Sequence, residues 1–174
     1  MKGILLIHLR SFLDATYPAL RWGDLLSECG IAQMFASGWD YPDSIMTTIV
    51  DTACRRLRVS QAEFWYRFGR HSMKEFRKNY RWYFDERPDA RAFFISLNET
   101  HADAVAHIPG ASPPTFETRL GDDRRELALT YRSPRHLVSY LRGAIDGILD
   151  IYGEKADVSM QEDGGCAVFT LRFH

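Results

Sequence analysis

The chain has 174 residues, of which 45% are hydrophobic and 13% aromatic, and its formal net charge at pH 7 is -1. This length fits one domain, long enough to bury about 70% of the surface that the unfolded chain would expose. A charge so close to zero gives no general attraction to nucleic acid or to anionic lipid, so neither is expected as a partner.

The first half of the chain is predicted to be helical. Apolar side chains at helical spacing predict a helix over 2–17, with Leu5 and Leu9 facing inward. A short second helix over 22–29 is stopped by Gly30, because glycine favours the position just after a helix.

Two further helices are expected before the middle of the chain. The segment 42–57 begins with Pro-Asp-Ser and carries an apolar pattern at helical spacing, and Ser60 is placed to cap the helix that follows. Gly69 interrupts the apolar pattern of that helix, so a separate helix is predicted from there toward Tyr80.

A histidine stands in the apolar stripe of the next predicted helix. Asp89 is placed to start this helix, and apolar side chains recur at helical spacing from Ala90 to Ile108. His101 occupies a position in the stripe where an apolar side chain is expected. Such a histidine is usually a core residue with its hydrogen bonds satisfied, and the alternative is a metal ligand in an apolar pocket.

The last third of the chain predicts four short strands. Polar and apolar side chains alternate in four segments, 116–120, 127–133, 158–160 and 169–173. Asp163-Gly164 marks a hairpin between the last two segments. Together with the helices, this pattern predicts an α+β fold with an antiparallel sheet. No internal repeat or linker divides residues 1–174, so a single domain is expected.

The cysteines and the hydropathy pattern indicate the compartment. Cys29, Cys54 and Cys166 are odd in number and far apart, which argues against a disulfide framework or a zinc cluster. No apolar run approaches the ~20 residues of a membrane span. A soluble, cytoplasmic protein with reduced thiols is therefore expected.

The junction between the second strand and the helix after it collects polar groups. Ser133-Pro134 suits the cap and first position of a helix, so the strand is predicted to feed directly into a helix there. The phenol of Tyr131, the hydroxyl of Ser133, the guanidinium of Arg135 and the helix amides would all attract a carboxylate. The alternative is an ordinary strand-to-helix turn with an exposed arginine.

These residues resemble a known family. Tyr131-x-Ser133-x-Arg135 is similar to the signature of the heme nitric oxide/oxygen binding (H-NOX) family, which is related to the heme domain of soluble guanylate cyclase. His101 stands about thirty residues upstream, before a proline-containing loop, as that family requires. Three further segments are similar to family members, so the resemblance spans the chain: Met1 to Ile4, Trp65 to Arg70, and Tyr152 to Lys155.

The resemblance implies a non-covalent heme b between two lobes, a distal helical lobe of about 1–65 and a proximal lobe of about 66–174. His101 would be the axial ligand of the heme iron. Tyr131, Ser133 and Arg135 would hold the heme propionates, and Pro114 would press on the porphyrin and distort it.

The gas would bind on the opposite face of the iron. Tyr140 stands where oxygen-binding members of the family carry a distal tyrosine, which predicts an O2 complex in addition to complexes with NO and CO. The rest of this distal pocket would consist of Leu5, Leu9, Ser72, Phe76 and Ala144. Leu9 and Ser72 replace the tryptophan and asparagine that usually orient the tyrosine. Alternatively, Tyr140 is a core residue bonded to a backbone carbonyl.

The implied function is gas sensing without enzymatic activity. Gas binding, and for NO rupture of the bond between iron and His101, would rotate the lobes and signal to a separate effector, such as a histidine kinase or a cyclic-di-GMP enzyme. Two alternatives remain. One is a heme enzyme that handles peroxide or O2 with His71 and Arg70 as its acid–base pair. The other is a heme-free module that binds a flat carboxylate or a partner helix.

Overall fold

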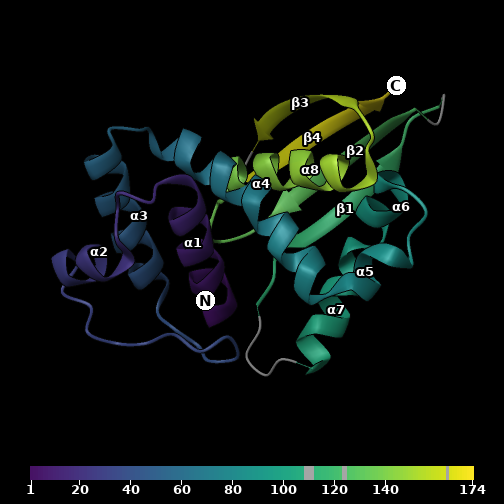
Figure 1. The fold of residues 1–174 in the computed structure, drawn as a ribbon. Helices are drawn as coiled ribbons and strands as arrows, with labels where there is room; N and C mark the ends of the chain where they lie inside the picture. Colours follow the sequence, from purple (N-terminus) through teal and green to yellow (C-terminus); the bar gives the residue numbers. More distant parts are fainter. Residues whose placement is uncertain (108–111, 123–124, 164) are drawn as a thin grey trace.

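The computed structural model describes residues 1–107, 112–122, 125–163 and 165–174. Figure 1 shows α1, α2 and α3 on one side of the molecule and the sheet with α5, α6 and α7 on the other, while α4 runs from one side to the other. The helices are α1 (Gly3–Thr16), α2 (Trp22–Glu28), α3 (Asp43–Leu57), α4 (Gln61–Asn79), α5 (Arg81–Asp85), α6 (Ala90–Ile95), α7 (Leu97–His107) and α8 (Val138–Tyr152). The strands are β1 (Thr115–Leu120), β2 (Glu126–Arg132), β3 (Ala156–Asp163) and β4 (Cys166–Phe173).

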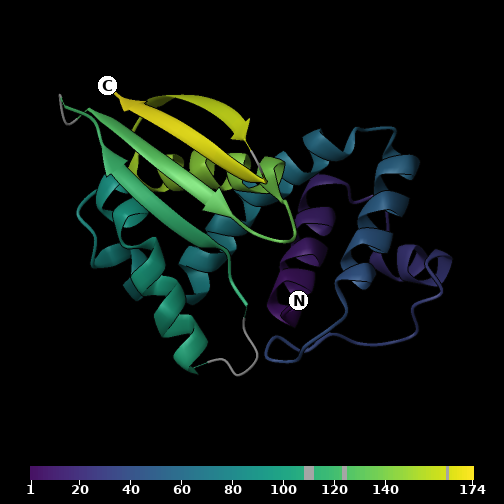
Figure 2. The same ribbon diagram turned by 180° about the vertical axis from the view of Figure 1, so that it is seen from behind.

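The strands form one antiparallel sheet in the order β1-β2-β4-β3, which confirms the predicted α+β fold. Helix α8 connects β2 to β3 and lies against one face of the sheet, and α4 packs across α8 (Figures 1 and 2). Leu127, Leu129 and Tyr131 alternate as buried positions of β2, as their spacing predicts. No helix among the described residues has the length and apolar character required to cross a bilayer.

Two hydrophobic clusters hold the fold together. The first lies among α1, α2, α3 and the first half of α4, and it includes Phe64 and Phe68 of α4. The second lies between the sheet, α6 and α8, and Met73 and Phe76 from the second half of α4 pack against it. Tyr140 of α8 contacts both clusters. Helix α4 and the side chain of Tyr140 therefore each contact both halves of the chain.

The predicted break at Gly69 is wrong, because α4 continues through it to Asn79. A Cβ at Gly69 would come within 2.0 Å of the backbone oxygen of Tyr140, and one at Gly143 within 1.8 Å of the backbone oxygen of Tyr66. The two glycines thus allow α4 and α8 to cross in backbone contact. Gly69 is required by this contact between helices and does not end a helix.

The stripe that starts at Asp89 forms two helices instead of one. The Asp89 carboxylate accepts a hydrogen bond from the amide of Ala92 at 2.7 Å, so the predicted cap is confirmed. At Ser96 the chain turns between α6 and α7, and the Ser96 hydroxyl donates to the carbonyl of Phe93 at 3.0 Å. This bond within the turn competes with continuation of the helix. Ile108, the predicted end of the stripe, lies outside the described residues, as does Gly164 of the predicted hairpin.

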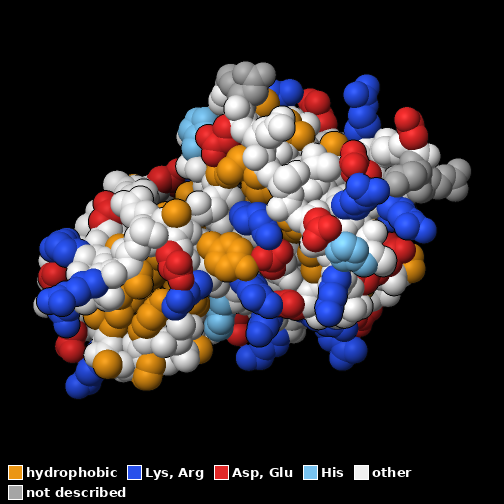
Figure 3. Space-filling model, turned by 90° about the horizontal axis from the view of Figure 1, so that it is seen from above, with side chains coloured by type: hydrophobic (Ala, Val, Ile, Leu, Met, Phe, Trp, Pro, Cys, Tyr) orange, Lys and Arg blue, Asp and Glu red, His pale blue; other side chains and the backbone are white. Residues whose placement is uncertain are grey.

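Ion pairs join α4 to α8 across the surface above this crossing. The guanidinium of Arg70 binds both carboxylate oxygens of Asp150, at 2.7 and 2.9 Å, and the hydroxyl of Tyr66 donates to Asp146 at 2.6 Å. Basic and acidic side chains are interspersed on the face seen from above in Figure 3. This face therefore carries both signs of charge side by side.

Candidate functional site

His101 of α7 presents one ring nitrogen for coordination. Its Nδ1 lies 3.2 Å from the carbonyl oxygen of Pro114, and because a carbonyl can only accept, Nδ1 carries the proton. Burial lowers the pKa of His101, and the bond to the Pro114 carbonyl opposes that shift only in part, so the ring is neutral near pH 7. A neutral imidazole bonded in this way has its Nε2 lone pair available, which is the usual state of a histidine that binds a metal.

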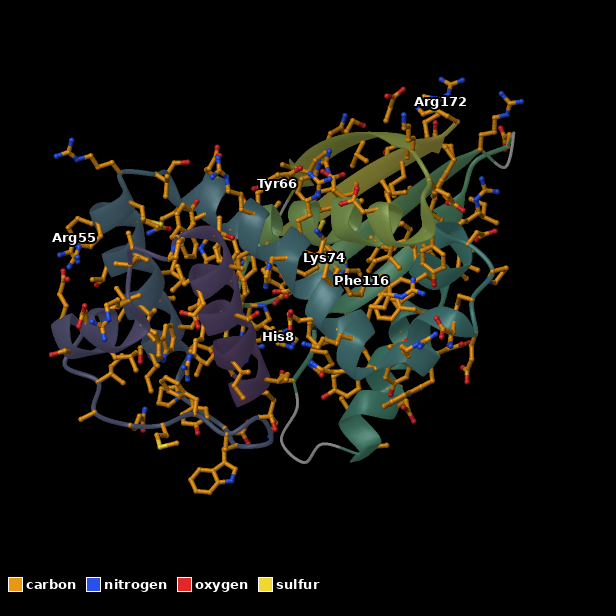
Figure 4. The ribbon with its side chains drawn as sticks, viewed as in Figure 1. His8, Arg55, Tyr66, Lys74, Phe116 and Arg172 are labelled. Atoms are coloured by element: carbon orange, nitrogen blue, oxygen red, sulfur yellow. The ribbon has the colours of Figure 1, made fainter. Side chains whose placement is uncertain are left out.

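Contacts with β1 hold His101 in place. The backbone amide of Phe116 donates to Asn98 Oδ1 at 3.0 Å, and the Asn98 amide donates back to the Phe116 carbonyl. The Phe116 ring lies 5.4 Å from the His101 ring and 5.7 Å from the Tyr131 ring. Phe116 therefore stands between the predicted iron ligand and the predicted propionate site. Figure 4 labels Phe116 on the sheet side of the molecule.

The junction after β2 is a turn, and the prediction that Ser133 and Pro134 begin a helix is wrong, because α8 begins at Val138. The Ser133 hydroxyl accepts a hydrogen bond from the amide of Arg135 at 3.2 Å, and His136 has a φ of 45°. The bond between the Ser133 hydroxyl and the amide of Arg135 favours a turn over a helix. The left-handed conformation of His136 is incompatible with a right-handed helix at that position.

The same turn uses the hydroxyls of Tyr131 and Ser133 as acceptors. Tyr131 accepts from the amide of Leu137 at 3.3 Å, just as Ser133 accepts from Arg135. An amide donor occupies one lone pair of each hydroxyl and leaves its proton to be donated elsewhere. Both side chains are buried, so a carboxylate that reaches them would accept well-oriented hydrogen bonds.

Arg135 joins this turn to the first half of the chain. Its Nε donates to Asp43 of α3 at 2.7 Å, and its Nη1 donates to the carbonyl of Ser112 at 2.8 Å. Burial by itself would raise the pKa of Asp43, but the hydrogen bonds and charges of Arg135 and the terminal ammonium outweigh burial and lower it. The structure therefore brings Tyr131, Ser133 and Arg135 to one turn and adds Asp43, which the sequence did not suggest.

Tyr140 lies between the two hydrophobic clusters. Its ring is 5.3 Å from Phe68 and 6.3 Å from Trp65, and its hydroxyl is buried without a hydrogen-bond partner among the described residues. Burial raises the pKa of Tyr140 to about 12, and the nearby Ser72 opposes that shift, so the phenol keeps its proton and can donate it. The hydroxyls of Ser72 and Tyr140 do not meet hydrogen-bond geometry.

The remaining predicted distal residues come from both halves of the chain. Leu5 and Leu9 belong to the first cluster, with Leu9 fully buried and Leu5 half-buried. Phe76 and Ala144 belong to the second cluster, and Ser72 is buried on α4 between Phe68 and Phe76. The predicted pocket therefore spans the boundary between the clusters.

His8 is a candidate that the interpretation of the sequence missed. Its side chain is 1% exposed, and neither ring nitrogen has a hydrogen-bond partner among the described residues. Its ring meets the Phe76 ring edge-on, with centroids 4.6 Å apart. Because His8 follows Leu5 by three residues and precedes Phe12 by four, helical spacing alone places it on the buried face of α1.

Burial of His8 predicts that acid destabilises the protein. Burial lowers the pKa of His8 to about 4 from its ordinary 6.5; the charge of Glu75 opposes the shift and His71 adds to it. Between these values the unfolded chain takes up a proton that the folded chain does not, so the free energy of unfolding falls as the pH falls from about 7 to 4. For this group alone the loss is about 3 kcal/mol.

Urea unfolding over this pH range measures the loss. His8→Leu is expected to flatten the dependence, while the control His174→Gln, at an exposed position, leaves it unchanged. His71, His101 and Asp43, whose pKa values are also lowered, leave a residual slope of the same sign. An unaltered slope in His8→Leu would contradict the prediction.

The acid–base pair suggested for a heme enzyme is not assembled. Arg70 points to Asp150 on α8, whereas His71 Nε2 lies 3.2 Å from the hydroxyl of Ser11 on α1. The two side chains therefore have different partners on different helices.

Comparisons with known proteins identify a family and a fold. The sequence model of the haem-NO-binding family matches residues 2–160. No curated protein matches the sequence. Many solved structures share the fold, and among them are three that each match nearly the whole chain at low sequence identity.

The first is the crystal structure of an H-NOX protein from S. oneidensis in the Fe(II)NO ligation state, with 19% identity and a TM-score of 0.93 over 100% of this chain and 99% of that one. The second, an oxygen-binding H-NOX domain related to soluble guanylate cyclases in its oxygen complex, has 22% identity and a TM-score of 0.86 over 99% and 95%. The third, a mutant Fe(II) unliganded H-NOX protein from K. algicida, has 17% identity and a TM-score of 0.86 over 100% and 97%.

Because the family model covers most of its length, the chain belongs to the haem-NO-binding (H-NOX) family, which is related to the heme domain of soluble guanylate cyclase.

Proposed function

We propose that this chain binds heme b and senses a diatomic gas through it. The observation that carries the proposal is the state of His101, whose Nδ1 proton is held by the Pro114 carbonyl and whose Nε2 has no hydrogen bond to the described residues. A bound heme would supply an iron atom with one position for His101 and one for NO, O2 or CO. Family membership supports the same cofactor.

The turn after β2 suits the carboxylates of such a cofactor. Tyr131 and Ser133 each keep a hydroxyl proton. Arg135 binds Asp43 and Ser112 through Nε and Nη1, and its Nη2 has no hydrogen bond to the part of the chain that the structure describes. Charge-assisted hydrogen bonds from these three groups would fix the orientation of the heme. In the same proposal Pro114, which already positions His101, is the residue that presses on the porphyrin.

The choice of gas would depend on polarity near Tyr140. Its buried phenol has a proton to donate, and four of the residues proposed for the pocket wall, Leu5, Leu9, Phe76 and Ala144, are apolar. Bound O2 carries partial negative charge and gains from a donor, whereas NO and CO gain far less. One such hydrogen bond contributes about 1.5–3 kcal/mol, or roughly ten- to a hundredfold in affinity.

The two hydrophobic clusters suggest how gas binding would be transmitted. In the proposed division, lobes of about 1–65 and 66–174 move relative to one another, and a ligand can drive that motion only by binding one arrangement more tightly. The Arg135–Asp43 ion pair connects the carboxylate-binding turn to α3 across the two halves. The chain would then act in the cytoplasm as a regulatory domain, without catalysis, on an effector such as a histidine kinase or a cyclic-di-GMP enzyme.

The visible absorption spectrum of the purified protein tests this proposal. Reduced without oxygen, it is expected to show five-coordinate ferrous heme, and on exposure to air a stable oxy complex if Tyr140 donates. A five-coordinate spectrum that responds only to NO and CO would keep the sensor and remove Tyr140 from this role. Absence of heme after expression with ample heme, and no uptake on titration, would overturn the proposal.

A further inference from the structure

His8 is a polar group without a partner inside the protein. It lies on α1 where α1 faces α4 (Figure 4), and both of its ring nitrogens are buried without a hydrogen bond among the described residues. A buried polar group that makes no hydrogen bond destabilises the folded state, and leucine at this position would avoid that cost. His8 therefore makes the folded state less stable than leucine at the same position would.

The charged groups nearest to His8 do not satisfy it. His71 and Glu75 of α4 are close enough to influence it, but His71 bonds to the hydroxyl of Ser11 at 3.2 Å and lies 4.0 Å from Glu75. Neither makes a hydrogen bond to His8 within the described part of the chain. A ligand bound next to His8 would give its N–H an acceptor.

Its neighbours place His8 beside the proposed gas pocket. The His8 ring packs against Phe76. His8 also shares a face of α1 with Leu5 and is adjacent in sequence to Leu9. Phe76, Leu5 and Leu9 all belong to the proposed pocket wall. Ser72 and Tyr140 also have buried hydroxyls without partners in the described structure. Ser72 lies near Tyr140, and His8 contacts Phe76, which follows Ser72 by one helical turn on α4.

We propose that His8 is a second hydrogen-bond donor of the gas pocket and helps to decide which gas is retained. The inference rests on the proposed function, since it requires heme on the side of the pocket opposite His101. A neutral imidazole carries one N–H, which can donate to the partial negative charge on bound O2. It would supplement Tyr140, whose usual tryptophan and asparagine partners are replaced by Leu9 and Ser72.

The test compares His8→Leu, which removes the donor, with His8→Gln, which keeps an N–H donor. The readouts are the C–O stretching frequency of the ferrous CO complex and the O2 dissociation rate. His8→Leu is expected to raise the C–O frequency, because a donor near bound CO lowers it. It should also speed O2 dissociation by roughly ten- to a hundredfold. His8→Gln should recover part of both effects, and the control His71→Gln should leave both at their wild-type values.

Urea unfolding of the same variants separates this role from a structural one. His8→Leu is expected to be at least as stable as wild type, because leucine removes the unsatisfied group. An unchanged C–O frequency in His8→Leu would overturn the inference and leave His8 as a core residue. Because this measurement uses the CO complex, it tests the role of His8 even if no stable oxy complex forms. A wild-type protein that forms no CO complex would overturn the proposed function as well.

Discussion

His101→Gly is expected to abolish the five-coordinate ferrous spectrum, and added imidazole is expected to restore it. The glycine leaves a space next to Phe116 and the Pro114 carbonyl, into which free imidazole fits with the same donor and the same lone pair. Loss of a group that only orients a ligand lowers metal affinity by about 10- to 100-fold, so loss of the ligand itself should cost at least ~100-fold in heme affinity without imidazole.

The control for this experiment is His71→Gln. His71 is also half-buried, but it bonds to Ser11 on α1, and its loss should leave the ferrous spectrum as in wild type. A His101→Gly protein that keeps the wild-type spectrum without added imidazole would show that another residue binds the iron. Loss of the spectrum in His71→Gln would instead indicate that the iron ligand comes from the side of the heme opposite His101.

Local patterns predicted most of the fold. Alternation of Leu127, Leu129 and Tyr131 identified the buried face of β2, and the side chain of Asp89 identified the start of α6. Both features depend on residues within a few positions of each other, where periodicity and capping act. The helical spacing of the apolar residues after Asp89 placed His101 on the inward face of its helix.

The wrong predictions depended on contacts that are distant in sequence or on competing local bonds. Gly69 was expected to end a helix because glycine is a poor helix former, but its neighbour is the backbone of Tyr140 on α8. Ser133 was expected to cap a helix, but its hydroxyl closes a turn with Arg135 instead. A serine before a proline is compatible with both outcomes, and only the left-handed His136 decides between them.

The candidate site was predicted in part for the same reason. Tyr131, Ser133 and Arg135 lie close together in sequence, so their convergence could be expected from the motif. Asp43 was not found, because its contact with Arg135 joins residues 92 positions apart. His8 was not found either: helical spacing places it on the buried face of α1, but its contact with Phe76 of α4 and its lack of a hydrogen-bond partner among the described residues are visible only in the structure.

Gly143→Ala is expected to destabilise the protein by at least about 3 kcal/mol, toward the upper end of what overpacking costs. The added Cβ would lie 1.8 Å from the backbone oxygen of Tyr66 and 3.0 Å from the backbone nitrogen of Arg70, and neither is a flexible side-chain end that could move aside. Helices α4 and α8 would have to separate. In a helix without such a contact, alanine would instead stabilise by up to about 1 kcal/mol.

Gly23→Ala supplies that comparison, because Gly23 lies in α2 and no atom of the described residues comes within 4 Å of an added Cβ. Urea unfolding should therefore give opposite signs for the two substitutions, and equal effects would show that the backbones of α4 and α8 do not touch in solution. Separation of these helices would also move Tyr140, three residues before Gly143 on the same helix. If Tyr140 donates to bound O2, Gly143→Ala should weaken O2 retention in the fraction that still folds, whereas Gly23→Ala should not.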